Sequence, residues 1–502
     1  MIARHQIWRA AAGAIPFALA LGLVVRLYSG LGDGQLFDED YAVYLQQAWN
    51  IAHHVKMAQM GVIQPLDLRL PLTDQSPLIY PPLLPLLYAV PVSIWQFDLH
   101  AFKMIQLSIL LLTLVLFCHA MRKWRFSILE TSVSLVVFAT SYEIRRSVNT
   151  IDADIPFLFL MVWALLVVDA AISARGRGRH LWGVAAGAAI FVAVNMRTVG
   201  VVLLPALVVA DTLRARRWRP AVTVVPVATI ALLWLCQRLA LGPNEAYSYI
   251  LHYRFFTVIT NIRGFYWAIA ASLRASPVFH LELAIFLALS ALALVALARE
   301  AMRGAVLAVF VVAYTGLLLI LPDFAAGCRY LLPQLLVLGA FAVRGAAIVS
   351  AAILRTGRPG VAPVAAGALA IFFAAFVPAP LPAGEWGFGA TAAPARQLFA
   401  FVRQHTPPDA VVAAMKYRSL HLFTQRTTMR IPPAASPQAL IEELRRDRVS
   451  AVVVKYSPPA QTYDFTDCPA LPFCRPAALG SEARQVFRNR DYAVFAIAPS
   501  EN

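Results

Sequence analysis

The sequence alternates long apolar runs with short polar segments. Eleven runs approach the length of about 20 residues that a helix needs to cross a bilayer, so we expect eleven transmembrane helices. The expected spans are residues 8–29, 101–121, 127–143, 154–172, 181–196, 198–213, 220–241, 277–298, 303–322, 329–350 and 360–380.

A twelfth apolar run, residues 83–97, is short and contains two prolines. Clusters of Arg and Lys between the longer runs decide its place, because such clusters favour the cytoplasmic side of a membrane. With eleven spans every cluster is cytoplasmic, whereas a crossing at 83–97 would move all later clusters outside. We therefore expect residues 83–97 to lie in or dip into the outer leaflet, with the N-terminus in the cytoplasm. The clusters are Arg4 with Arg9, residues 122–125, 175–179 and 214–219, Arg299 with Arg303, and Arg355 with Arg358.

The pattern changes near residue 381, where amphipathic helices alternate with short β-branched strands. Ser436 has the position of a helix N-cap, and Val449–Val454 reads as a buried strand. We expect a membrane domain over residues 1–380, with residues 30–100 as its first outer loop, and a small extracytoplasmic α/β domain over 381–502. Cys468 and Cys474 in that domain form a disulfide or remain free thiols.

Composition supports a polytopic membrane protein and excludes a soluble one. The 502 residues are 60% hydrophobic and 14% charged. The formal net charge is +16, and the placement of Arg between apolar runs assigns it to membrane topology rather than to nucleic-acid binding.

Two acidic clusters fall at the same expected outer face. Asp38, Glu39 and Asp40 follow the first span and come just before an amphipathic helix expected from Tyr41 onward, and Asp152 and Asp154 precede a later span. Carboxylates at these positions serve either as helix caps or as functional groups. Capping accounts for one carboxylate of each cluster and does not require the others.

Arginines are expected at the same face, at Arg197, Arg254, Arg263 and Arg329. Each one alone could extend to lipid headgroups. Together with the carboxylates they suit a reaction with a phosphate leaving group, because a carboxylate accepts a proton from the attacking group and Arg binds phosphate.

Four segments in order resemble the GT-C superfamily of membrane glycosyltransferases, in the branch of bacterial protein O-mannosyltransferase-like and lipid A aminoarabinose transferase-like proteins. They are "DEDYAVYLQQAWNIA", "YPPLLPLLYAV", "IDADIPFLFL" and "RYLLPQLLVL". The resemblance covers roughly residues 1–380. It implies transfer of a sugar from a polyprenyl-phosphate donor to a lipid, protein or glycan acceptor at the outer face of the bacterial cytoplasmic membrane.

The resemblance also assigns roles to residues. Asp38 matches the general base, Glu39 assists it, and Asp154 matches the acid of the later loop better than Asp152 does. The alternative for these acids is a divalent metal ion held by Asp38 and Asp154, with Glu39 helping to bind it. The donor phosphate would contact residues Arg197, Arg254, Arg329 and Tyr330.

One motif departs from the aminoarabinose transferases, which have Glu-Lys-Pro where this chain has Tyr80-Pro81-Pro82. The missing Lys argues against an aminoarabinose donor. The alternatives to a glycosyltransferase are a flippase or transporter, a polysaccharide polymerase or ligase that uses a lipid-pyrophosphate donor, and a structural membrane protein. The chain shows no repeat between its halves, which argues against the transporter.

Overall fold

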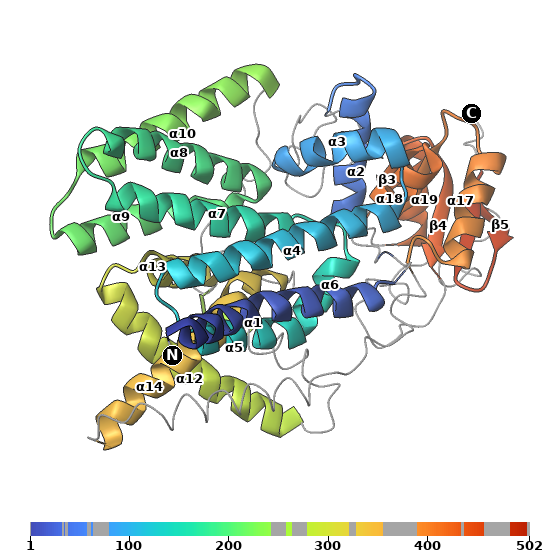
Figure 1. Ribbon diagram of the computed structural model, residues 1–502. Coiled ribbons are helices and arrows are strands. Elements are labelled where there is room, and N and C mark those ends of the chain that lie inside the picture. Colours follow the sequence, from blue (N-terminus) through green and yellow to red (C-terminus); the bar gives the residue numbers. More distant parts are fainter. Residues whose placement is uncertain are drawn as a thin grey trace.

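A helical bundle makes up most of the molecule, and a small sheet lies at one end of it (Figure 1). The computed structural model describes residues 2–32, 35, 39–57, 62–63, 80–241, 258–263, 279–320, 328–354, 389–432, 436–455 and 482–498. These ranges do not include the predicted domain boundary near residue 380. They also do not include Cys468 and Cys474.

Helices occupy ten of the eleven predicted spans, and the eleventh, residues 360–380, lies outside the described residues. These ten are α1 (Ile2–Ser29), α4 (Leu99–Lys123), α5 (Ile128–Thr140), α7 (Asp154–Ser173), α8 (Gly178–Met196), η2 (Thr198–Val202) with α9 (Leu203–Ala215), α10 (Pro220–Leu241), α12 (Phe279–Met302), α13 (Val306–Ile320), and η5 (Cys328–Leu331) with α14 (Leu332–Leu354).

Six described helices are each long and apolar enough to cross a membrane. They are α4, α7, α8, η2 with α9, α10, and η5 with α14. Residues 286–302 and 306–320 pass the same test together and are bent by 115° between them, which brings the number to seven if the pair is one span. The protein is therefore a multi-pass membrane protein.

The predicted span 127–143 is shorter than expected. Ser141 has an extended backbone, ends α5, and caps the next helix, α6 (Tyr142–Asn149), by accepting from the Ile144 N–H at 3.4 Å. An extended residue whose side chain caps a new helix breaks the regular helical path. Helix α3 (Leu83–Trp95) has 13 residues, as α5 does, fewer than the about 20 of a full crossing, so the placement of residues 83–97 in the outer leaflet stays a prediction.

Small residues let the helices approach closely. A Cβ at Gly339 would lie 2.8 Å from backbone atoms of Ser134 on α5, and a Cβ at Gly345 would overlap the Leu292 carbonyl on α12. A Cβ at Gly187 on α8 would lie 2.7 Å from the Pro226 carbonyl oxygen on α10. Such contacts are typical of helix packing in membranes, where van der Waals contact replaces the hydrophobic drive.

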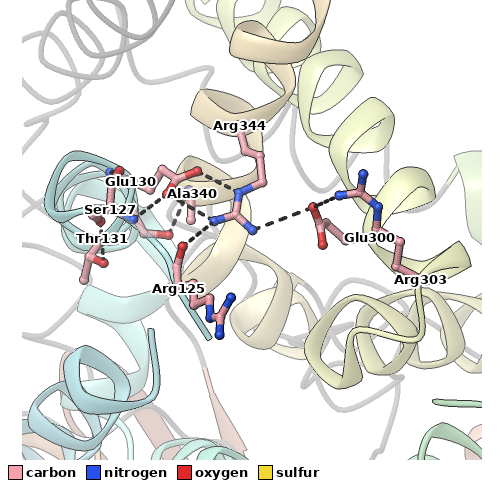
Figure 2. Close-up of polar contacts among 9 residues, drawn as sticks. Arg125, Ser127, Glu130, Thr131, Glu300, Arg303, Ala340 and Arg344 are labelled. Carbon is pink, nitrogen blue, oxygen red and sulfur yellow. Dashed lines mark hydrogen bonds and ion pairs between the residues drawn. The ribbon is translucent and has the colours of Figure 1, made fainter. Parts of the chain in front are cut away.

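An ion-pair cluster joins α5, α12 and α14 (Figure 2). Arg344 donates from Nε to Glu130 Oε1 at 2.7 Å, and its Nη1 lies 3.9 Å from Glu300 Oε1. Arg344 lies 15 residues along the α14 span from Arg329, which corresponds to on the order of 20 Å. We call the end of the bundle that holds Arg344 the opposite end, and the end that holds Arg329 the site end.

The sheet has six strands in the order β1-β3-β2-β4-β6-β5. Strands β1 to β4 pair in parallel, and β6 runs antiparallel to both β4 and β5. The strands are β1 (Val62–Ile63), β2 (Val411–Ala414), β3 (Thr427–Arg430), β4 (Val449–Lys455), β5 (Ala483–Arg488) and β6 (Tyr492–Ile497). Their helices are α17 (Ala393–His405), α18 (Tyr417–Thr424) and α19 (Pro437–Arg446).

The predicted elements of the C-terminal sequence are present. The Ser436 hydroxyl caps α19 by accepting from the Ala439 N–H at 3.1 Å, and the predicted strand Val449–Val454 is β4. Helix α18 and strands β1, β3 and β5 were not predicted. Strand β1 comes from the first outer loop and pairs with β3, so the sheet joins two parts of the chain that are far apart in sequence.

Candidate functional site

Asp40 is the first acidic side chain that the structure places at the site end. It lies in the first turn of α2 (Glu39–Ala52), where the helix dipole favours a carboxylate. Its Oδ1 accepts from the Tyr80 hydroxyl at 2.5 Å, and its Oδ2 accepts from Arg329 Nη2 at 3.2 Å. The carboxylate is thus held from both sides.

Tyr80 is fixed by its neighbours. Pro81 follows it and restricts its backbone, and its ring lies 5.0 Å from the ring of Tyr44, one helical turn after Asp40. Its hydroxyl oxygen accepts a hydrogen bond from Arg418 Nη1 at 3.2 Å. Because Arg418 belongs to α18, the C-terminal region reaches the site.

Asp152 and Asp154 form the second acidic group. Asp152 Oδ2 accepts from the Thr150 hydroxyl, and its Oδ1 accepts from the backbone N–H of Asp154, both at 3.0 Å. Gln106 of α4 donates to the Asp152 carbonyl at 2.8 Å and to the Tyr88 hydroxyl at 3.0 Å. These bonds fix the turn that presents Asp154 at the start of α7.

Arg197 pairs with Asp154 Oδ1. Its backbone is extended and ends α8, and η2 then folds back closely enough that a Cβ at Gly200 would lie 2.9 Å from the Ala193 carbonyl oxygen. A larger residue than Gly would open this turn. The pair is buried, with 13% of the Arg197 side chain and 2% of the Asp154 side chain exposed.

Tyr330 links the two acidic groups. The Arg197 guanidinium lies 4.1 Å from the centre of its ring, and that of Arg329 lies 5.5 Å from it. Two carboxylate–arginine pairs, Asp40 with Arg329 and Asp154 with Arg197, therefore flank one aromatic ring. Cation–π contacts of this kind hold guanidinium groups in fixed positions.

The two acidic groups have opposite protonation preferences. Burial raises the pKa of Asp40, but Arg329, the Tyr80 hydroxyl and Arg418 outweigh it, so the pKa lies below its usual range. Burial also raises the pKa of Asp152, and there Arg329 and Arg197 do not fully offset it. Asp40 therefore favours its ionised form, whereas Asp152 keeps its proton to a higher pH than a free aspartate does.

The structure brings together Asp154, Arg197, Arg329 and Tyr330, all of which the sequence singled out. Asp38, Arg254 and the side chain of Glu39 lie outside the described residues, so their roles stay predictions. Sequence reasoning did not assign Tyr80 or Arg418. Tyr80 stands in a quoted motif, whereas nothing local in the sequence marks Arg418.

The predicted metal site also stays a prediction. Asp38, one of its two ligands, lies outside the described residues, and Asp154, the other, has Arg197 on one oxygen. Within the described ranges, no group of three or more His, Cys, Asp or Glu side chains could hold a metal ion.

Comparison with known proteins places the fold. Neither a family model nor a curated protein sequence matches the chain. Among solved structures, it is similar to ArnT from Cupriavidus metallidurans in the apo state, with a TM-score of 0.54, 14% identity and 98% of each chain covered. For ArnT bound to undecaprenyl phosphate, the TM-score is 0.52 and the identity 13%, with 97% of this chain and 98% of that one covered.

A second similarity is to the oligosaccharyltransferase of Archaeoglobus fulgidus tethered with an acceptor peptide. The TM-score is 0.55 and the identity 14%, with 89% of this chain and 69% of that one covered. Both of these proteins are membrane glycosyltransferases of the GT-C superfamily. The chain shares their fold, over 98% of its length for ArnT and 89% for the oligosaccharyltransferase.

Proposed function

We propose that this protein is a glycosyltransferase that moves a sugar from a polyprenyl-phosphate donor to an acceptor hydroxyl or amine. One observation carries the proposal. Two arginine–carboxylate pairs flank Tyr330 at one end of a GT-C bundle. The structures with a similar fold include one bound to undecaprenyl phosphate and one bound to dolichol phosphate, which supports a lipid-phosphate donor.

The arginines suit the departing phosphate. When the bond between the sugar C1 and the phosphate oxygen breaks, the lipid phosphate takes the electron pair of that bond. Arg197 and Arg329 carry permanent charge and bind phosphate oxygens through paired N–H groups. Their present partners, Asp154 and Asp40, keep them extended toward the site before the donor arrives.

A carboxylate suits the acceptor. The attacking oxygen or nitrogen forms a bond to C1 and loses a proton, which a carboxylate within hydrogen-bond reach accepts. We assign this role to Asp38, which precedes α2 and is two residues from the fixed Asp40 in sequence. Glu39 assists it, and Arg254 joins the donor-phosphate contacts.

The bacterial cytoplasmic membrane suits such a donor. In the orientation that follows from the Arg clusters, the N-terminus is cytoplasmic and the site end and the C-terminal region are extracytoplasmic. The acceptor is then a lipid, protein or glycan outside the cytoplasm.

The test is sugar transfer in membranes that contain wild type or Asp38→Asn, with radiolabelled polyprenyl-phosphate sugars as donors. Asn differs from Asp in charge and hardly in shape, so we expect label to leave the lipid in wild type and not in the variant. Asp98→Asn is the matched control, because Asp98 is an exposed cap of α4 that accepts from the His100 N–H at 3.0 Å.

Near-normal transfer by Asp38→Asn would show that Asp38 is not the base, while the transferase proposal would stand. If wild type consumes none of the donors, the transferase proposal itself fails, and lipid transport becomes the next activity to assay.

A further inference from the structure

Among the described residues of the C-terminal region, Arg418 of α18 contacts a side chain of the site. Arg418 Nη1 donates to the Tyr80 hydroxyl oxygen at 3.2 Å, and that hydroxyl donates to Asp40 at 2.5 Å. Arg329 binds the other oxygen of Asp40 at 3.2 Å. A continuous chain of hydrogen bonds therefore runs from α18 through Tyr80 and Asp40 to the start of the α14 span.

Apolar packing holds α18 in place for this contact. Helix α18 lies against α2, α2 in turn lies against α3, and Figure 1 shows α2 and α18 at the sheet end of the molecule. Tyr417, Leu420 and Leu422 are buried in the same hydrophobic core as Tyr41 and Leu45 of α2. The two helices thus form one packed unit rather than two surfaces in loose contact.

A second attachment fixes the same region. Strand β3 begins three residues after the end of α18 and pairs with β1 of the first outer loop, at Val62 with Thr428. The buried Thr428 hydroxyl also donates to the Tyr417 carbonyl at 2.8 Å. The first outer loop, which carries α2 and Tyr80, is therefore tied to the region that carries Arg418.

We propose that Arg418 is a positioning residue of the donor site, supplied by the C-terminal region, which holds the Tyr80 hydroxyl on Asp40 and so fixes the carboxylate that aligns Arg329. The inference rests on the proposed transfer reaction and adds a residue and a role for the C-terminal region. Transfer then requires this region docked on α2.

The first test is the kinetics of transfer by Arg418→Ala, Tyr80→Phe and the double variant. Each single variant removes a hydrogen bond of the chain that ends on the charged Asp40 carboxylate, and such a loss corresponds to about a tenfold fall in rate. We expect this fall in kcat, with little change in the KM for the donor. Because Arg418 acts through Tyr80, the double variant should be no slower than Tyr80→Phe alone. Arg418→Lys keeps a donor and should restore part of the rate.

The control is Arg445→Ala, which breaks an ion pair of 3.1 Å with Glu482 elsewhere in the C-terminal region. We expect it to leave kcat unchanged. The inference fails if the falls in kcat of the two single variants multiply in the double variant, or if Arg418→Ala has the kcat of wild type. Neither result affects the proposed function, which wild-type transfer tests separately.

Hydrogen exchange gives a readout that needs no activity. We expect Arg418→Ala and Tyr80→Phe to raise exchange in the first turn of α2 by similar amounts and to leave β4 and β6 protected. Loss of protection in β4 and β6 as well would mean that Arg418 only stabilises the fold of its own region, which contradicts the inference. Unchanged exchange in α2 would contradict it too.

Discussion

Replacing Arg344 with Met should destabilise the bundle without altering the site. Arg344 makes two bonds to Glu130, at 2.7 and 3.2 Å, and one to the Arg125 carbonyl at 3.1 Å. Its guanidinium also lies 3.7 Å from the centre of the Phe126 ring. Met keeps an apolar stem of similar length and removes all of these contacts. Figure 2 shows the polar ones.

The burial of the pair sets the magnitude of the effect. Only 19% of the Arg344 side chain and 11% of the Glu130 side chain are exposed. Removing one partner of a fully buried pair costs about 3 to 5 kcal/mol, and of an exposed pair less than about 1 kcal/mol. Glu130 keeps its bond from the Ser127 N–H at 2.5 Å. We therefore expect a loss of about 2 to 3 kcal/mol in the free energy of unfolding.

The assay is denaturant titration in mixed micelles, followed by transfer activity per folded protein. Arg303→Met is the matched control, because Arg303 is 57% exposed and its pair with Glu300 at 3.3 Å should contribute less than about 0.5 kcal/mol. Equal stability of Arg344→Met and wild type would refute the reasoning about burial. A fall in activity per folded molecule would refute the separation of the two ends of the bundle.

Two further variants test the packing and the electrostatics. Gly187→Val should lower the free energy of unfolding by about 1 to 3 kcal/mol in the same titration, because its side chain would collide with Pro226, and equal stability would contradict the observed helix contact. For Asp152→Asn, the comparison is made as a function of pH. The raised pKa of Asp152 means that its native state holds the proton more tightly than the unfolded state, so wild type should lose stability relative to the variant as the pH rises above about 4. A difference in stability that stays constant as the pH rises would contradict that shift in pKa.

The sequence predicted the elements well because their signals are local. Apolar runs of sufficient length marked ten helices of the bundle, and Ser436 marked the start of α19 through its own hydroxyl. The short helix α5 was predicted too long because Ser141 is compatible with a continuing helix and acts as a cap only in its observed extended conformation. Strand β1 has two residues, too few for any periodic signal.

The site could be predicted in part for the same reason. Arg197, Arg329 and Asp154 stand at the ends of spans, where topology alone brings them to one face. Arg418 lies 338 residues from Tyr80 in a helix of eight residues, and its role depends on tertiary docking that no local pattern encodes.

The most direct test of the account is identification of the lipid product. Purified protein is incubated with a polyprenyl-phosphate sugar and candidate acceptors, and the lipids are quantified by mass spectrometry. The account predicts one molecule of polyprenyl monophosphate for each sugar transferred, formed by wild type and not by Asp38→Asn. Donor that keeps its sugar after incubation with wild type would contradict transfer, and so would a product that forms only from a pyrophosphate-linked donor.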